Sequence, residues 1–243
     1  MISNLKVYAV IPARSGSKSI KDKNILNFKG KPLFVHSIEQ SLKSTLIDRV
    51  FVSTDSENYR KIAIANGAEA PFLRPSEKSA DDSTDFDVFL HFIEWISENS
   101  ITVPDIIVHL RPTYPTRPIS IIDDAIKFFA NNMDKADSLR TVVKCTQTPY
   151  KMCRKEGLYL KPLLEVEDIY EFYNLPRQKL PQVYWQNACV DIIKTDIILK
   201  DKTISGTRIL HFEMDSDEIN DIDDWNDFQK AEKRERINNV KNI

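Results

Sequence analysis

Four cationic side chains lie close to a single glycine near the start of the chain, within residues 12–24 (PARSGSKSIKDKN). They are Arg14, Lys18, Lys21 and Lys23, and the glycine is Gly16. Backbone N–H groups of such a loop and cationic side chains can face the same anion, so the segment predicts a site for a group such as a triphosphate. A basic loop that only faces solvent is the alternative.

The spacing of this loop excludes two common nucleotide sites. The segment contains neither the phosphate-loop pattern G-x-x-x-x-G-K-[ST] nor the dinucleotide pattern G-x-G-x-x-G. The sequence therefore argues against a phosphate-loop ATPase and against a dinucleotide-dependent oxidoreductase.

A second candidate site is the pair Asp221 and Asp223, which flank Ile222 inside the acidic stretch 213–227. Alternate residues of an extended segment point the same way, so both carboxylates can ligate one hard cation such as Mg²⁺. Acidic residues also favour the start of a helix, and capping acids are the alternative here. Together, the basic loop and the aspartate pair suggest a nucleotide bound with a metal.

The elements around the basic loop alternate between strand and helix. A short apolar strand is expected at residues 5–11, ending at Pro12, and a helix after Pro32 with Phe34, Ile38 and Leu42 in one row. The next strand is expected at 49–53 and the next helix at 57–66, with Gly67 as its stop. The first strand would thus carry the basic loop at its carboxyl end.

The alternation continues to the C-terminus. Helices are expected around 86–96 and 119–129, the second with Ser120 and Asp123 as a capping box. The remaining expected elements are strands at 105–110, 190–193 and 208–212 and a helix at 225–235. This order predicts an α/β fold, a three-layer sandwich around a mainly parallel, nucleotide-binding, Rossmann-like sheet.

The pattern breaks between residues 147 and 186, where four prolines interrupt aromatic and charged pieces and no long helix fits. We interpret 1–243 as a single domain in which 147–186 is either a long excursion or a dimerisation arm.

Composition limits the classes of partner and the compartment. The net charge of −2 creates no general field for nucleic acid, and no run of about 18 apolar residues could span a membrane. The N-terminus lacks the pattern of a signal peptide, and the three cysteines form no C-x-x-C pair. These features predict a cytoplasmic protein with neither nucleic acid nor membrane as partner. The four histidines lie in apolar runs and are expected to be structural.

Several motifs in order resemble the acylneuraminate cytidylyltransferases, the CMP-sialic acid synthetases, over nearly the whole chain. The motifs are PARSGSK (12–18) with Lys23 and Asn24, VSTD (52–55), LRP (73–75), RPTYPTR (111–117), PRQKLP (176–181), QNA (186–188) and DID (221–223). The resemblance implies a nucleotidyltransferase of cell-surface glycan biosynthesis that transfers CMP from CTP to the anomeric hydroxyl of a sialic-acid-like nonulosonic acid. The same resemblance implies release of pyrophosphate, Mg²⁺ as cofactor and a homodimer.

The resemblance also assigns the site residues. CTP would be bound by Arg14, Ser17, Lys18, Lys23, Asn24, Arg74 and Asp85. The acidic sugar would be bound by Arg111, Lys151, Arg177, Asn187 and Asp191, with Lys151 and Arg177 reaching the partner's sugar site. The catalytic residues would be Arg14 and Lys18, which stabilise the leaving pyrophosphate, and Asp221 and Asp223, which carry Mg²⁺.

Two residues depart from the family's pattern. Arg111 stands where sialic acid enzymes have Gln, and Asp191 stands where they have an aromatic residue. Arg in place of Gln adds a cation, which suits an acceptor with a different substituent pattern or an extra anionic group. Legionaminic and pseudaminic acid are therefore candidate acceptors. A cytidylyltransferase for another acceptor such as Kdo and a catalytically inactive nucleotide-binding scaffold remain alternatives.

Overall fold

The computed structural model describes residues 4–80, 82–167, 169–215 and 221–241, with side chains of the last helix up to Lys233. Part of the acidic stretch, residues 216–220, thus lies outside the described residues. The chain divides into two compact units. The first contains Met1–Thr141, Ala188–Phe212 and the C-terminal segment with Asp221 and Asp223. The second contains Val142–Asn187 and, of the described residues, 213–215.

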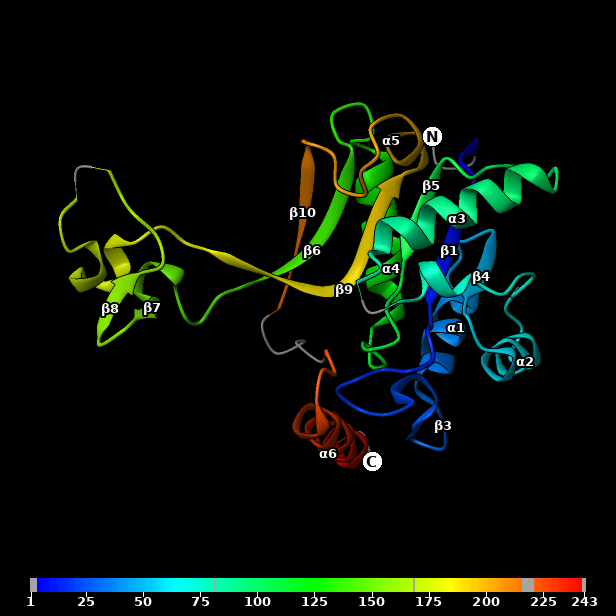
Figure 1. Cartoon of the computed structure of the whole chain (residues 1–243), viewed down its shortest axis with the longest axis horizontal. Coiled ribbons are helices and arrows are strands. Elements are labelled where there is room, and N and C mark those ends of the chain that lie inside the picture. The colour runs from blue at the N-terminus through cyan, green and yellow to red at the C-terminus, as the bar shows by residue number, and fades with distance from the viewer. Residues whose placement is uncertain (1–3, 81, 168, 216–220, 242–243) are drawn as a thin grey trace. The chain divides into compact units, whose positions relative to one another are not determined.

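A six-stranded sheet runs through the first unit in the order β10-β6-β9-β5-β1-β4 (Figure 1). The strands are β1 (Val7–Pro12), β4 (Arg49–Ser53), β5 (Ile106–His109), β6 (Ser138–Lys144), β9 (Tyr184–Lys194) and β10 (Ile209–Met214). β1 pairs in parallel with both β4 and β5, whereas β9 is antiparallel to β5. The predicted α/β class is confirmed, and β9 is an antiparallel strand within the predicted mainly parallel sheet.

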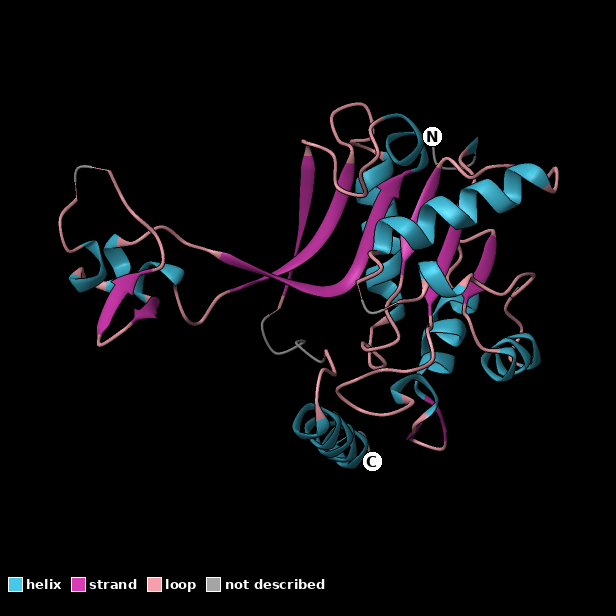
Figure 2. Cartoon of the chain, in the orientation of Figure 1, coloured by secondary structure: helices cyan, strands magenta, loops and turns pink. Residues whose placement is uncertain are grey.

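Helices cover both faces of this sheet (Figure 2). On one face the apolar sides of α3 (Asp85–Glu98) and α5 (Thr195–Lys200) join Tyr8 and Val10 of β1 in one buried cluster, in which α5 contacts α3 and α3 contacts β1. The opposite face is covered by α1 (Leu33–Lys43) and α4 (Ile119–Ala130), which contact each other. The alternation of side chains along β1 explains why both layers are apolar.

Two further helices complete the first unit. α2 (Glu57–Ala65) packs beside α1, where Tyr59 stacks on Phe34 with ring centroids 5.9 Å apart. α6 (Trp225–Lys241) places Phe228 against Phe28 next to the buried Ile222. Within the described residues, no helix is both long and apolar enough to cross a membrane.

The helix starts correct one sequence-based expectation. The capping box at Ser120 and Asp123 is wrong, because α4 begins directly after Pro118, which offers no side-chain cap. Asp123 instead accepts a hydrogen bond of 2.7 Å from Thr45 Oγ1 and another from Ser44, in the loop after α1. A capping box does occur at Thr84 and Asp87, at the start of α3.

Short elements occupy the rest of the chain. In the first unit they are η2 (Lys23–Ile25), β2 (Asn27–Phe28), β3 (Lys31–Pro32) and η3 (Ser76–Lys78). In the second unit they are η4 (Pro149–Lys151), β7 (Cys153–Glu156), β8 (Tyr159–Pro162), η5 (Phe172–Asn174) and η6 (Arg177–Lys179). The expectation that no long helix forms between 147 and 186 is confirmed for the described residues.

Gly206 precedes β10 and lies so close to Asp137 that a larger residue would not fit. Its φ is +65°, and a Cβ there would lie 2.3 Å from Cβ of Asp137, whose carboxylate accepts N–H bonds from Thr207 and Arg208. We expect Gly206→Ala to lower the free energy of unfolding by about 3 kcal/mol or more, from backbone strain plus the clash. Gly30→Ala is the matched control, because its φ is +83° with nothing within 4 Å, and should cost only about 1–2 kcal/mol. Equal losses in urea titrations of the two variants would contradict the packing argument.

Candidate active site

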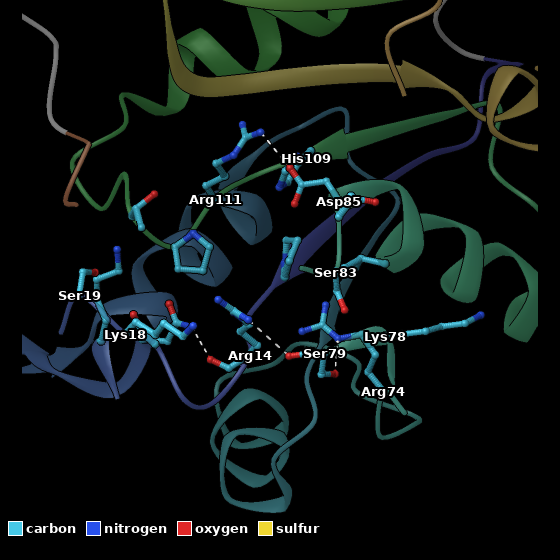
Figure 3. A pocket seen from close by; sticks show the side chains of 18 residues that line it. Arg14, Lys18, Ser19, Arg74, Lys78, Ser79, Ser83, Asp85, His109 and Arg111 are labelled. Atoms are coloured by element: carbon cyan, nitrogen blue, oxygen red, sulfur yellow. Dashed lines mark hydrogen bonds and ion pairs between the residues drawn. The ribbon is translucent and has the colours of Figure 1, made fainter. Parts of the chain in front are cut away.

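A pocket of about 460 Å³ lies at the carboxyl ends of β1 and β5 (Figure 3). Ligands of open α/β sheets bind at this edge, because loops and helix starts converge there. All seven predicted CTP-binding residues line the pocket, namely Arg14, Ser17, Lys18, Lys23, Asn24, Arg74 and Asp85. The structure thus brings together residues from the loop after β1, the segment before α3 and the end of β5.

The loop after β1 is held in place by backbone and carboxylate contacts. Ala13 donates its N–H to the carbonyl oxygen of Ser53 on the neighbouring strand at 2.9 Å. Ser15 donates both its N–H (2.7 Å) and its hydroxyl (2.8 Å) to the carboxylate of Asp55. Gly16 follows with a φ of +75°, a conformation that favours glycine. Asp55 at the end of β4 therefore fixes the turn that presents the cationic side chains.

Arg14 and Arg74 extend along one side of the pocket. Arg14 donates from Nη1 to the carbonyl of Ala80 at 2.9 Å, and its own carbonyl accepts from the side chain of Asn24 at 2.9 Å. Arg74 is buried and donates from Nε to Ser79 Oγ at 3.0 Å. Burial lowers the pKa of Arg74, partly opposed by the carboxylates of Asp55 and Asp85. With Lys18 and Lys23, these residues form the cationic end of the pocket, whereas Lys78, which also lines it, forms an ion pair with Glu94 at 3.2 Å.

Ile222 anchors the aspartate pair next to that end. Its side chain is fully buried, and its N–H donates to the carbonyl of Thr113 at 2.9 Å. Its carbonyl accepts from Nζ of Lys23 at 2.8 Å. Asp221 and Asp223 therefore stand on either side of a fixed residue that touches two pocket-lining residues, although neither aspartate lines the pocket itself. Burial lowers the pKa of Lys23, while the carboxylates of Asp223 and Asp221 oppose that change.

The donor set of the aspartate pair fits a hard divalent cation. Oδ1 of Asp221 is buried and has no hydrogen-bond partner among the described residues, and burial raises the pKa of this carboxyl. A third acidic, His or Cys ligand does not join them in the described part of the chain. Mg²⁺ commonly uses one or two carboxylates and fills its other positions with water and substrate phosphates, so two aspartates suffice.

The other end of the pocket carries Arg111, which follows β5. Its guanidinium contacts two carboxylates: Nη2 lies 3.1 Å from Asp85, and Nη1 forms a short ion pair with Asp191 of β9. Burial works to lower the pKa of Arg111, but Asp191 and Asp85 outweigh it and the pKa lies above its ordinary value. The structure thus joins two of the five predicted sugar-binding residues.

The other three predicted sugar-binding residues belong to the second unit. Arg177 donates from Nη2 to the carbonyl of Cys145 at 3.1 Å, and Lys151 is exposed at the end of η4. Asn187 is buried, with Nδ2 3.3 Å from Sδ of Met214. Their assignment to a sugar site stays a prediction.

Some pocket residues are absent from the sequence-based assignment. Lys78 and Ser83 line the pocket. The Thr-x-x-Asp pattern at 84–87 marks the start of α3, directly after Ser83, and could have indicated this part of the site. Arg140 contacts Asp191 from β6, a strand that was not predicted because Arg140 and Lys144 interrupt its apolar run. His109 was expected to be structural, and it is buried at the floor of the pocket.

Comparison with known proteins gives the family. Relatives include an N-acylneuraminate cytidylyltransferase of Streptococcus agalactiae, 30% identical over 90% of this chain and 51% of the relative. A pseudaminic acid cytidylyltransferase of Campylobacter jejuni is 37% identical over 54% of this chain and 56% of its own length. The chain thus spans about half the length of the Streptococcus relative, and the match to the Campylobacter relative covers about half of either protein.

A solved CMP:2-keto-3-deoxy-manno-octonic acid synthetase complexed with CTP shares the fold. It has a TM-score of 0.70 at 16% identity and covers 96% of this chain and 99% of its own. Residues 8–170 match the cytidylyltransferase family model, which includes the basic loop, the segment before α3 and Arg111. The chain therefore belongs to the cytidylyltransferase family.

Proposed function

We propose that this protein transfers CMP from CTP to the anomeric hydroxyl of a sialic-acid-like nonulosonic acid. The observation that carries the proposal is the pocket at the carboxyl ends of β1 and β5, where Arg14, Lys18, Lys23 and Arg74 converge beside the Asp221–Asp223 pair. Such a set matches a triphosphate accompanied by a divalent cation.

The reaction needs positioning and charge neutralisation more than covalent help from the protein. The hydroxyl oxygen of the sugar attacks the α-phosphorus of CTP and its proton passes to solvent, the new P–O bond forms as the α–β phosphoanhydride bond breaks, and pyrophosphate leaves. Arg14 and Lys18 stabilise the charge that develops on pyrophosphate, and Asp55 keeps their loop in position through Ser15. Asp221 and Asp223 would hold Mg²⁺, which would neutralise negative charge on the phosphates when bound.

The class of acceptor is supported by the relatives. Relatives at 30% identity or more include proteins named for N-acylneuraminate, pseudaminic acid and N,N'-diacetyllegionaminic acid, all nonulosonic acids. Acidic sugars of this class have a carboxylate that suits the bidentate geometry of Arg, and Arg177 of the second unit is a candidate. We propose that the protein works in the cytoplasm, in keeping with its three free cysteines.

The test is pyrophosphate release from CTP with Mg²⁺ across a panel of acceptors. The panel contains N-acetylneuraminic, legionaminic and pseudaminic acid, with Kdo as the eight-carbon comparison. Release with a nonulosonic acid, and with CTP in preference to ATP, is the expected result. Pyrophosphate release with Kdo alone would mean that the acceptor is not a nonulosonic acid. CTP binding without pyrophosphate release from any acceptor would indicate an inactive nucleotide-binding scaffold.

We propose further that the protein is a homodimer joined through the predicted arm, 147–186. In the second unit, large apolar side chains around β7 and β8 are exposed, including Leu158 (98%) and Leu160 (68%). We expect a dimer at micromolar concentration in sedimentation experiments, and Leu160→Asp should shift it toward monomers by at least about 10-fold in dissociation constant.

Ile64→Asp is the matched control for this prediction. Ile64 is exposed on α2 of the first unit, so the same change should leave the dimer intact. A monomer with full activity in the unmodified protein would sink the dimer proposal.

A further inference from the structure

Arg111 belongs to a continuous network of five charged or titratable side chains. Its members are Asp85, His109, Arg111, Arg140 and Asp191. The register of β5 and β9 places Asp191 directly opposite His109. Because Arg111 follows His109 by two residues, Asp191 also lies close to Arg111. Asp191 then meets Arg111 through Oδ2 and Arg140 through Oδ1, the latter at 3.7 Å from Nε. Asp85 completes the network on the pocket side, 3.1 Å from Arg111.

Three members of this network are buried, so their charges must be paired to avoid a large cost in free energy. The side chains of Asp191, Arg140 and His109 are 4%, 8% and 1% exposed, so an unpaired charge among them would be costly. Arg140 is further fixed by the carbonyl of Ile204 at 2.8 Å and the hydroxyl of Ser205 at 3.1 Å. Burial holds the pKa of His109 well below its ordinary value, so its imidazole is neutral. Among these five side chains, two guanidinium cations therefore face two carboxylates, so this set is balanced. The buried guanidinium of Arg117, which donates to the backbone carbonyl of Arg111 at 3.1 Å, lies outside the set.

This balance contrasts with the opposite end of the pocket. Figure 3 shows Arg14, Lys18 and Arg74 at one end, and Arg111 with Asp85 and His109 at the other. The cationic end has an excess of positive charge for phosphates. The positive charge of Arg111, by contrast, is already matched by Asp85 and Asp191.

We propose that Asp191 is a positioning residue that holds Arg111 against Asp85 and keeps this wall of the pocket electrically balanced. The wall then meets an uncharged part of the substrates, such as hydroxyl or amide groups, through Arg111 N–H donors and the carboxylate of Asp85. The side chains of Arg111 and Asp85 are 29% and 36% exposed, so both can reach a ligand. The inference rests on the proposed function, and it replaces the expectation that Arg111 suits an extra anionic group.

The test measures binding of inorganic pyrophosphate by calorimetry at a fixed Mg²⁺ concentration. Asp191→Asn removes one carboxylate and leaves the wall positive, so pyrophosphate should bind roughly 3- to 10-fold tighter. Arg111→Gln removes the cation and leaves the wall negative, so binding should weaken by a similar factor. The double variant Asp191→Asn/Arg111→Gln restores balance and should return within about 2-fold of wild type.

Two controls keep the test decisive. Asp196→Asn makes the same charge change on α5, outside the pocket, and should leave the affinity unchanged. If Asp191→Asn does not fold, Asp85→Asn takes its place, since it removes the outer carboxylate of the same network and should also tighten binding. Melting curves accompany each variant.

The outcomes separate this inference from the proposed function. Pyrophosphate affinity that shifts in the same direction for Asp191→Asn and Arg111→Gln, or that does not shift in folded variants, would contradict the balanced wall. Binding of pyrophosphate by the wild-type protein would still support the anion site. Wild-type protein that binds neither pyrophosphate nor CTP would count against both. If the two variants shift pyrophosphate affinity in opposite directions but the protein binds CTP without transferring CMP, the balanced wall is supported and the proposed transferase activity is contradicted.

Discussion

Asp223→Asn is expected to reduce kcat by at least about 100-fold and to raise the Mg²⁺ concentration needed for half-maximal rate. The change keeps the volume of the side chain and removes one of the two charges that would hold the cation. Ile222 stays anchored through Thr113 and Lys23, so the segment keeps its position. Because Asp223 is exposed, the free energy of unfolding should change by only about 0.5 kcal/mol. Asp221→Asn should reduce kcat in the same way.

Asp224→Asn is the matched control for that experiment. It removes the same charge one residue away, and Asp224 accepts the N–H of Asp227 at the start of α6, a role that Asn performs equally well. Mg²⁺ titrations of pyrophosphate release should therefore give wild-type behaviour for Asp224→Asn. A normal kcat with an unchanged Mg²⁺ midpoint in both Asp221→Asn and Asp223→Asn would refute the metal site and leave capping acids as the explanation.

Arg14→Ala is expected to lower kcat/KM by about 100-fold or more without unfolding the protein. Its guanidinium lines the cationic end of the pocket and also bonds the carbonyl of Ala80, so the variant loses both a phosphate contact and a tie to the segment before α3. Arg14→Lys keeps the charge but not the planar fork, and should recover only part of the rate.

Lys21→Ala is the matched control within the same loop. Lys21 is exposed and does not line the pocket, so steady-state kinetics of this variant should stay within about 2-fold of wild type. A loss for Lys21→Ala as large as that for Arg14→Ala would mean that the loop acts through its overall charge. Near-normal turnover of Arg14→Ala would make the loop a solvated surface.

Local pattern was enough to locate most of the fold and the cationic half of the site. The strand before Pro12, the row of Phe34 and Ile38, and the stop at Gly67 all appear as expected, because each depends on neighbours within a few residues. The motif resemblance added Arg74 and Asp85, which local pattern did not reach.

Elements that depend on distant partners were harder to predict. β6 contains two cationic residues and is buried for most of its length, since Arg140 is neutralised and hydrogen-bonded by groups from β9 and the loop before β10. The capping box at Ser120 failed for a related reason: Asp123 binds the loop after α1 instead of its own helix start.

The sequence by itself determined that a basic loop follows a buried strand and that two aspartates flank an apolar residue near the C-terminus. Tertiary structure alone decided what their charges do. Lys23 meets the carbonyl of Ile222 across 199 residues, and Arg111 meets Asp191 across 80. The second pairing follows from β9 lying antiparallel beside β5, and strand order is set by burial of whole faces, which no local spacing reveals. The fold therefore decides whether the charge of a cationic side chain can act on a substrate or is already matched by a neighbouring carboxylate.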